Sequence, residues 1–111
     1  MTDIEQQLID RVKLGISRKQ VAFGRDMLVN MGRRKQLAMV WITEDLARNA
    51  TFKLIRECEN LELPLVIWGE SESIGELTGE PSVKVYLIKK NFSGLKTLLH
   101  DLKEADMFIY T

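Results

Sequence analysis

The sequence predicts an α/β/α sandwich, in which helices cover both faces of a central mixed sheet of about four strands. Short apolar stretches alternate with segments whose apolar residues recur at helical spacing. The 45% apolar and 29% charged residues are the balance of a globular protein. A chain of 111 residues can bury one sound core but not two. We therefore expect a single α/β domain over residues 1–111.

The first elements expected are a helix and a short strand. Apolar residues over 4–16 fall on one helix face, and Thr2 or Asp3 can cap the start by accepting backbone hydrogen bonds. A brief strand over 20–23 follows and ends at Gly24. A glycine at that point suits the entrance of a second helix.

The middle of the chain continues the alternation. The helix that follows Gly24 has an apolar face, and Gly32 can end it. Six apolar residues over 37–42 have the length and composition of a fully buried strand. A third helix is expected next, with Asn49 or Thr51 as its cap.

The last third completes the pattern. An apolar run over 65–68 predicts a second buried strand, and Ser71 can cap the short helix that follows it. The apolar residues over 83–88 predict another main strand. Ser93 then opens a final helix, and an apolar tail, Met107–Tyr110, ends the sequence.

Positive and negative charges are unevenly distributed along a chain whose formal net charge is +0. Residues 1–40 carry a net +4, residues 41–82 a net −6 and residues 83–111 a net +2. Neutrality argues against indiscriminate nucleic-acid binding but leaves room for one basic face. The densest basic run is 33–35, which is either such a face or an ordinary solvated surface.

The inventory of reactive groups predicts no enzyme and no cofactor. The chain lacks the glycine-rich fingerprints of phosphate-binding loops. A single cysteine, Cys58, and a single histidine, His100, exclude a disulfide framework and a histidine-based metal cluster. Glu44 and Asp45 follow a buried strand, where they could hold Mg²⁺ or where Asp45 could simply start the next helix. No third ligand joins them at a recognisable spacing.

The compartment is also constrained by the sequence. The N-terminal residues are polar and lack the apolar core of a signal peptide, and no apolar run is long enough to cross a bilayer. One cysteine fits a reducing environment. We therefore expect a cytoplasmic protein with no membrane partner.

Five short motifs occur in an order that resembles one known family. Leu14-Gly15-Ile16-Ser17-Arg18-Lys19 is similar to the end of the first helix in the kink-turn-binding ribosomal proteins, the L-seven-Ae and L-thirty-e group. Gly24 before a helix resembles the glycine of their RNA-binding turn. The other three motifs are Ile42–Asp45, Leu63–Val66 and Ile74–Gly79. The resemblance covers about residues 8–102, and the family's fold is also an α/β/α sandwich.

The resemblance implies an RNA-binding protein that associates with ribosomes or another ribonucleoprotein. The family contacts RNA through the turn after the glycine and through the loop before the last strand. The matching positions in the turn are Gly24, Arg25, Asp26, Met27 and Asn30, and those in the loop are Glu80, Pro81, Ser82 and Val83. The basic run Arg33, Arg34 and Lys35 is expected to hold phosphates.

Two features leave a different class of function open. Asp26 and Met27 stand where the family carries Asn-Glu, which changes the groups offered to RNA bases. The growth-arrest and DNA-damage-inducible proteins share the fold but work through protein partners and dimers. The acidic middle block and the apolar tail favour such a protein-interaction module, including a homodimer formed through the tail.

Overall fold

The structure, a computed structural model, describes residues 1–109 as alternating helices and strands. Within these residues the helices are α1 (Asp3–Ser17), α2 (Arg25–Arg33), α3 (Arg48–Asn60), α4 (Ser71–Thr78) and α5 (Leu95–Glu104). The strands are β1 (Val21–Phe23), β2 (Leu37–Ile42), β3 (Leu65–Ile67) and β4 (Val85–Lys89). Each predicted helix and strand is present. None of these helices is long and apolar enough to span a membrane.

The four strands form one mixed sheet in the order β1-β4-β2-β3. The last strand, β4, is central and runs antiparallel to both of its neighbours, β1 and β2. The edge strand β3 pairs in parallel with β2, because α3 provides the crossover that a parallel pair needs. The expected mixed sheet is confirmed.

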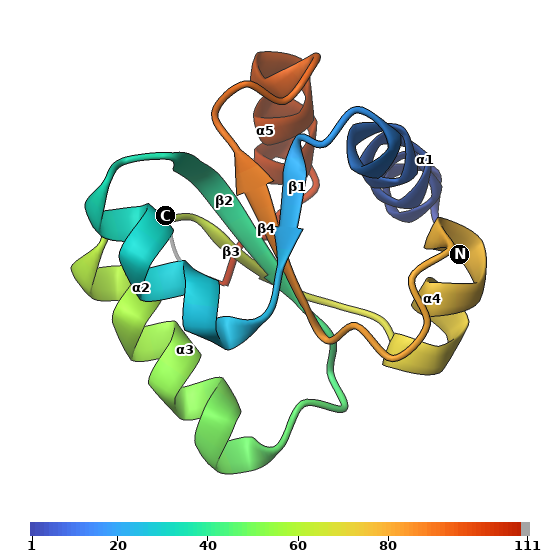
Figure 1. Cartoon of the computed structure of the whole chain (residues 1–111). Helices are drawn as coiled ribbons and strands as arrows, with labels where there is room; N and C mark the ends of the chain where they lie inside the picture. The colour runs from blue at the N-terminus through green and yellow to red at the C-terminus, as the bar shows by residue number, and fades with distance from the viewer. Residues whose placement is uncertain (110–111) are drawn as a thin grey trace.

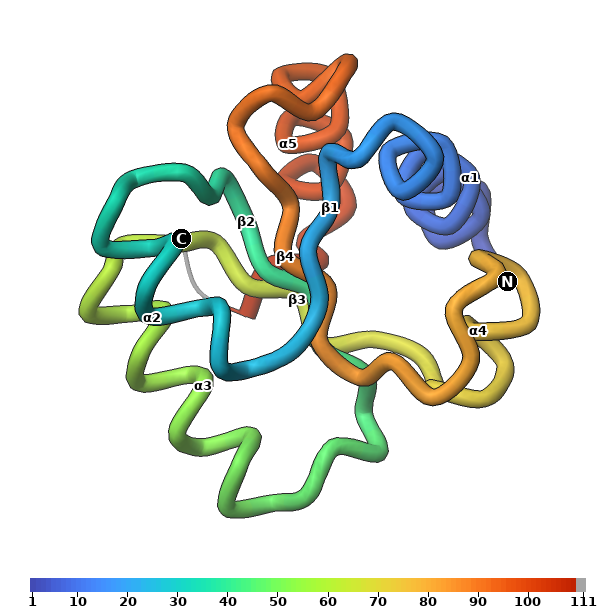
Figure 2. Tube along the Cα trace, viewed as in Figure 1, coloured from blue at the N-terminus to red at the C-terminus, as the bar shows by residue number. Residues whose placement is uncertain are grey.

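Helices cover both faces of the sheet, as Figure 1 and Figure 2 show. Helices α1, α4 and α5 pack on one face, and α2 and α3 pack on the other. The side chains of β2 divide between the two sides, with Met39 and Trp41 facing the first group and Val40 and Ile42 the second. This alternation follows from the two-residue period of a strand. The α/β/α sandwich is therefore confirmed.

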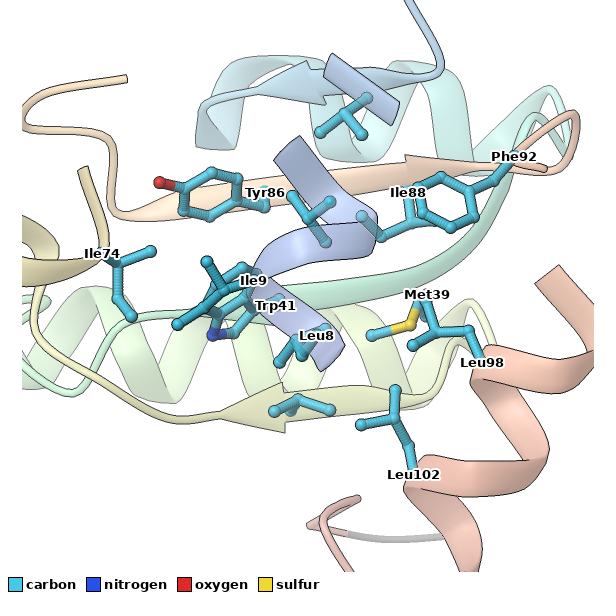
Figure 3. Close-up of a cluster of buried hydrophobic side chains, with 13 residues drawn as sticks. Leu8, Ile9, Met39, Trp41, Ile74, Tyr86, Ile88, Phe92, Leu98 and Leu102 are labelled. Atoms are coloured by element: carbon cyan, nitrogen blue, oxygen red, sulfur yellow. The ribbon is translucent and has the colours of Figure 1, made fainter. Parts of the chain in front are cut away.

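The larger core lies under α1, α4 and α5 (Figure 3). Trp41 is fully buried and stacks on Tyr86, with ring centroids 4.6 Å apart. The Tyr86 hydroxyl lies 3.2 Å from the hydroxyl oxygen of Thr78 on α4. Burial raises the pKa of Tyr86, because a phenolate would lose its hydration in this core.

The second core joins α2 and α3 to the opposite face. Leu28 from α2 and Leu54 and Cys58 from α3 are buried against the side chains of β2 and β4. Each such leucine contributes roughly 1.5–3 kcal/mol relative to an exposed one. Cys58 thus has the expected place on the apolar side of its helix.

The start of α1 has the predicted cap. The backbone N–H of Glu5 donates to the Thr2 hydroxyl at 3.3 Å, and the Glu5 carboxylate accepts from the Thr2 backbone N–H at 2.7 Å. This reciprocal pair is a capping box. The hydrogen bond from the Thr2 backbone lowers the pKa of Glu5.

Several predicted helix boundaries are wrong. Helix α5 begins at Leu95 and is preceded by Gly94, so Ser93 does not open it. Helix α2 continues through Gly32 to Arg33, since the backbone N–H of Arg34 still donates to the Asn30 carbonyl at 3.3 Å. Helix α3 begins at Arg48 with no side-chain cap. Thr51, one of the expected caps, instead lies inside the helix and donates its hydroxyl to the Ala47 carbonyl at 3.1 Å.

The C-terminal segment runs along the outer edge of β3. Phe108 pairs with Val66 in an antiparallel bridge, and the backbone N–H of Ile109 donates to the Leu65 carbonyl at 3.0 Å. The part of the apolar tail over 107–109 therefore covers an edge of the chain's own sheet. Tyr110, the last member of the predicted tail, lies outside the described residues.

Candidate nucleic-acid interface

Gly24 opens α2 in a backbone conformation that other residues rarely adopt. Its φ is +95° and its ψ is 155°, and no side chain caps the helix that follows. The first N–H groups of a helix have no partner within the helix. The start of α2, with Arg25, Asp26 and Met27 all exposed, can therefore offer N–H groups and a partial positive charge to a phosphate.

The loop over 80–83 lies at the same edge of the sheet as this helix start. The backbone N–H of Gly24 donates to the carbonyl of Val85 at 3.1 Å, and Phe23 pairs with Tyr86. The end of β1 therefore lies beside the start of β4, so the turn at Gly24 and the loop before β4 lie at the same end of the sheet. The turn leads to α2 on one face of the sheet, and the loop packs against α4 on the other.

Close packing against α4 sets the position of the 80–83 loop. A Cβ atom at Gly75 would lie 2.8 Å from the backbone oxygen of Glu80 and 2.9 Å from the Cα of Pro81. Only glycine permits this approach. Within the loop, Glu80 and Val83 are half-buried, whereas Pro81 and Ser82 are exposed.

The electrostatics of this edge are mixed. A hollow of about 730 Å³ beside the loop is lined by Glu72 and Glu76 as well as by Lys84. Asp26 is exposed in the first turn of α2, next to Arg25. Cations and carboxylates therefore alternate at this edge, so the attraction of a phosphate to positive charge does not dominate its electrostatics.

The basic run over 33–35 lies at the far end of α2. Arg33 lies eight positions after Arg25 in the helix, about 12 Å along the axis at 1.5 Å per residue. Asn30 lies between these two ends and is exposed. The structure therefore separates Arg33, Arg34 and Lys35 from the glycine-opened start of the helix.

Asp45 has a structural partner that was not expected. Its carboxylate accepts the backbone N–H of Ser71 at 2.9 Å and the Ser71 hydroxyl at 2.5 Å, so it caps α4 rather than the next helix along the chain. The Ser71 hydroxyl lowers the pKa of Asp45 to about 2. Ser71 is the first residue of α4, so the expectation that it is the cap is wrong. Glu44 is exposed beside Asp45, and no group of three or more potential metal ligands occurs among residues 1–109.

A second concentration of cations joins the predicted residues Arg34 and Lys35 to others that the sequence does not place beside them. Lys89 ends β4 and Lys90 follows it, beside two loops that each carry an Arg-Lys pair. The signal in the sequence is the tripeptide Arg-Lys-Gln, which occurs at 18–20 and again at 34–36. Its meaning depends on the strand order, which the sequence pattern does not reveal.

Comparison with known proteins defines the fold class. No family model and no curated protein matches the sequence. Among solved structures, the Giardia lamblia 15.5kD RNA binding protein matches with a TM-score of 0.78 at 20% identity, covering 95% of this chain and 88% of that one. A protein with unknown function from Bacillus halodurans C matches with a TM-score of 0.72 at 19% identity, covering 83% of this chain and 95% of that one. At these identities the likeness establishes a shared fold.

Proposed function

We propose that this chain is a non-enzymatic RNA-binding protein similar to the ribosomal kink-turn binders, and that it works in a cytoplasmic ribonucleoprotein such as the ribosome. The observation that carries the proposal is the contact between Gly24 and Val85, which places the start of α2 and the 80–83 loop at the same end of the sheet. The likeness to an RNA-binding protein of the same fold supports it.

The physical basis is the combination of a helix start and a loop at the same end of the sheet. The N–H groups at the start of α2 and the guanidinium of Arg25 would bind phosphates. The exposed loop residues Pro81 and Ser82 would meet bases that a bent RNA displays. Asp26 accepts hydrogen bonds and repels phosphates, so this surface would favour base edges with donor groups over an unbroken duplex.

The test is a titration of a fluorescein-labelled kink-turn RNA stem and of a matched straight duplex at two salt concentrations. Arg25→Glu is expected to weaken binding to the kink-turn stem by tenfold or more, because it replaces an attraction to phosphate with a repulsion. Lys96→Glu is the matched control, since Lys96 is exposed on α5 in the opposite helix layer. It should change the affinity less than about twofold.

Two results would reject the proposal. One is the absence of binding to either RNA at micromolar protein. The other is an equal effect of Arg25→Glu and Lys96→Glu, which would mean that the start of α2 makes no specific contact.

A protein-interaction module of the same fold is the second candidate. The observation that favours it is an apolar hollow of about 540 Å³ between α3, α5 and the C-terminal segment, with Leu63, Leu99 and Phe108 in its lining. Ile109 beside Phe108 is 42% exposed. Light scattering tests for a homodimer at this surface. A full-length protein that is a monomer, and that stays a monomer when residues 106–111 are deleted, would count against it.

A further inference from the structure

A cluster of positive charge lies at the opposite end of the strands from Gly24. There the ends of α1, α2 and β4 bring six cations together, and we call this surface the basic edge: Arg18, Lys19, Arg34, Lys35, Lys89 and Lys90. We propose that the basic edge is a second RNA-binding surface, which holds the phosphates of a different RNA segment from the one at the start of α2. This inference rests on the proposed function.

Two copies of the same tripeptide build most of the basic edge. Arg-Lys-Gln follows α1 at 18–20 and follows α2 at 34–36. Arg18 and Arg34 are the C-caps of the two helices, and Lys19 and Lys35 have φ values of 59° and 58°.

The hydrogen bonds of the two turns are also the same. The backbone N–H of each lysine donates to the carbonyl three residues back, and that of each glutamine to the carbonyl five residues back, at 2.8–3.0 Å. Both helices therefore end in the same closure, and the strands that follow them, β1 and β2, start at the same end of the sheet (Figure 2).

Strand β4 joins the two turns. Because β4 lies between β1 and β2, its last residues contact both tripeptides. The backbone N–H of Lys89 donates to the Gln20 carbonyl at 3.0 Å, and that of Lys90 donates to the Gln36 carbonyl at 2.9 Å. The Lys89 ammonium also donates to the carbonyl of Lys19 at 3.1 Å. Three cationic dipeptides from distant parts of the sequence thus become neighbours.

The segments that form the basic edge, 18–20, 33–36 and 89–91, contain no Asp or Glu, whereas Glu62 lies at the same end of the sheet in the turn before β3. A crevice of about 330 Å³ opens beside these segments, with Gln36, Lys89 and Lys90 in its lining. This contrasts with the alternating charges around Gly24 and suits an anionic polymer recognised through its backbone.

The backbone conformation of Lys19 and Lys35 does not by itself select a cation. The same closure, with a left-handed residue other than glycine, also ends α3 at Glu62 and α5 at Asp106. The turns after α1 and α2 differ from these because each carries an Arg-Lys pair and contacts the end of β4. The favourable interaction of cations with helix C-termini accounts for Lys19 and Lys35 but not for Lys89 and Lys90, which lie at and just after the end of a strand.

The two proposed surfaces are too far apart to share one phosphate group. They lie at opposite ends of β2, whose six residues span about 20 Å at 3.3 Å each. An RNA that touches both must present two separated segments. The protein would then hold two parts of one folded RNA in a fixed relation.

The decisive variant is Lys19→Gly/Lys35→Gly, because it removes two charges while relieving backbone strain. We expect it to melt no lower than the wild type and yet to bind a kink-turn stem with single-stranded tails about tenfold more weakly in 100 mM KCl. The slope of log affinity against log salt should fall by roughly 0.7–0.9 for each phosphate that the variant no longer binds. Lys96→Gln/Lys103→Gln, two exposed lysines on α5, is the matched control and should change the affinity less than about twofold.

The outcomes separate this inference from the proposed function. Unchanged RNA affinity in Lys19→Gly/Lys35→Gly, alongside weaker binding by Arg25→Glu, would overturn the basic edge and leave the proposed function standing. An equal decrease in affinity in the α5 control would also overturn it, because any surface lysine would then serve. A wild-type protein that binds no RNA would reject the proposed function itself. If both surfaces act, the fold decreases of Arg25→Glu and Lys19→Gly/Lys35→Gly should multiply in the combined variant.

Discussion

The carboxylate of Asp45 caps α4 by accepting the backbone N–H of Ser71, 26 residues further along the chain, at 2.9 Å. The Ser71 hydroxyl and the Lys84 ammonium, 3.9 Å away, are the other partners of this carboxylate. Asp45 follows β2, Ser71 follows β3 and Lys84 precedes β4, so one side chain connects three segments at the edge of the sheet where Gly24 lies.

Asp45→Ala should lower the free energy of unfolding by about 1 kcal/mol at pH 7, as the removal of a helix cap does. The pKa of Asp45 is about 2 in the folded chain and 3.8 without these contacts, so the carboxylate stabilises the fold above about pH 4. This contribution disappears as the pH falls through about 2. Urea unfolding should therefore show the gap between wild type and variant closing in acid.

Glu44→Gln provides the comparison for Asp45, because Glu44 is the preceding residue and is exposed. Its unfolding free energy should stay within about 0.5 kcal/mol of the wild type. Equal stabilities of the Asp45→Ala and Glu44→Gln variants at pH 7 would show that Asp45 does not cap α4.

Gly75→Ala should destabilise the protein by about 1–3 kcal/mol, because the new methyl group would overlap the backbone of Glu80 and Pro81. Neither atom belongs to a flexible side chain, so the loop must move away from α4. Thermal melting monitored by circular dichroism measures the destabilisation. Glu76→Ala, at the next and exposed position, should melt close to the wild type. A Gly75→Ala protein that is as stable as Glu76→Ala would contradict this packing.

Tyr86→Phe should cost about 1 kcal/mol at pH 7, because the Thr78 hydroxyl loses one of its two buried partners and keeps only the Ile74 carbonyl. At high pH the difference in unfolding free energy between the wild type and Tyr86→Phe should be smaller. Burial raises the pKa of Tyr86 above 10.0, so the unfolded chain releases this proton first and the stability of the wild type falls as the pH rises past about 10. Phenylalanine has no such proton, and urea unfolding at neutral and alkaline pH should show the stabilities of the two proteins converging. A difference in unfolding free energy that stays the same at both pH values would contradict the raised pKa of Tyr86.

Ile109→Pro should promote self-association, because proline lacks the N–H that bonds to Leu65 and would uncover part of the β3 edge. Ile109→Ala keeps that donor and serves as the matched variant. Light scattering over a range of concentrations should show a higher mean mass for Ile109→Pro alone. The same mass for both variants would mean that this hydrogen bond does not protect the edge.

Much of the fold could be predicted because it follows from local periodicity. The six apolar residues Leu37–Ile42 predict a buried strand, and β2 has these bounds. Helix boundaries were less predictable, since Asp45 caps α4 from a distant segment and no local signal reveals it. The strand order was inaccessible because the pairing of Val21 with Ile88 is a tertiary contact.

The candidate site also has parts that the sequence predicts and parts that it does not. The resemblance predicted that Gly24 and the loop over 80–83 act together, and the structure places both at the same end of the sheet. The position of Arg33 relative to Arg25 depends on the length of α2, which extends past Gly32. The repeated Arg-Lys-Gln is visible in the sequence, but only β4 makes its two copies neighbours.

The central position of β4 also affects how the chain folds during its synthesis. During synthesis the ribosome releases β1, β2 and β3 first, yet β1 has no pairing partner among them. The final quarter of the polypeptide must therefore emerge and insert between segments made much earlier. Such late, long-range closure slows folding and leaves nascent strands open to chaperones until it is complete.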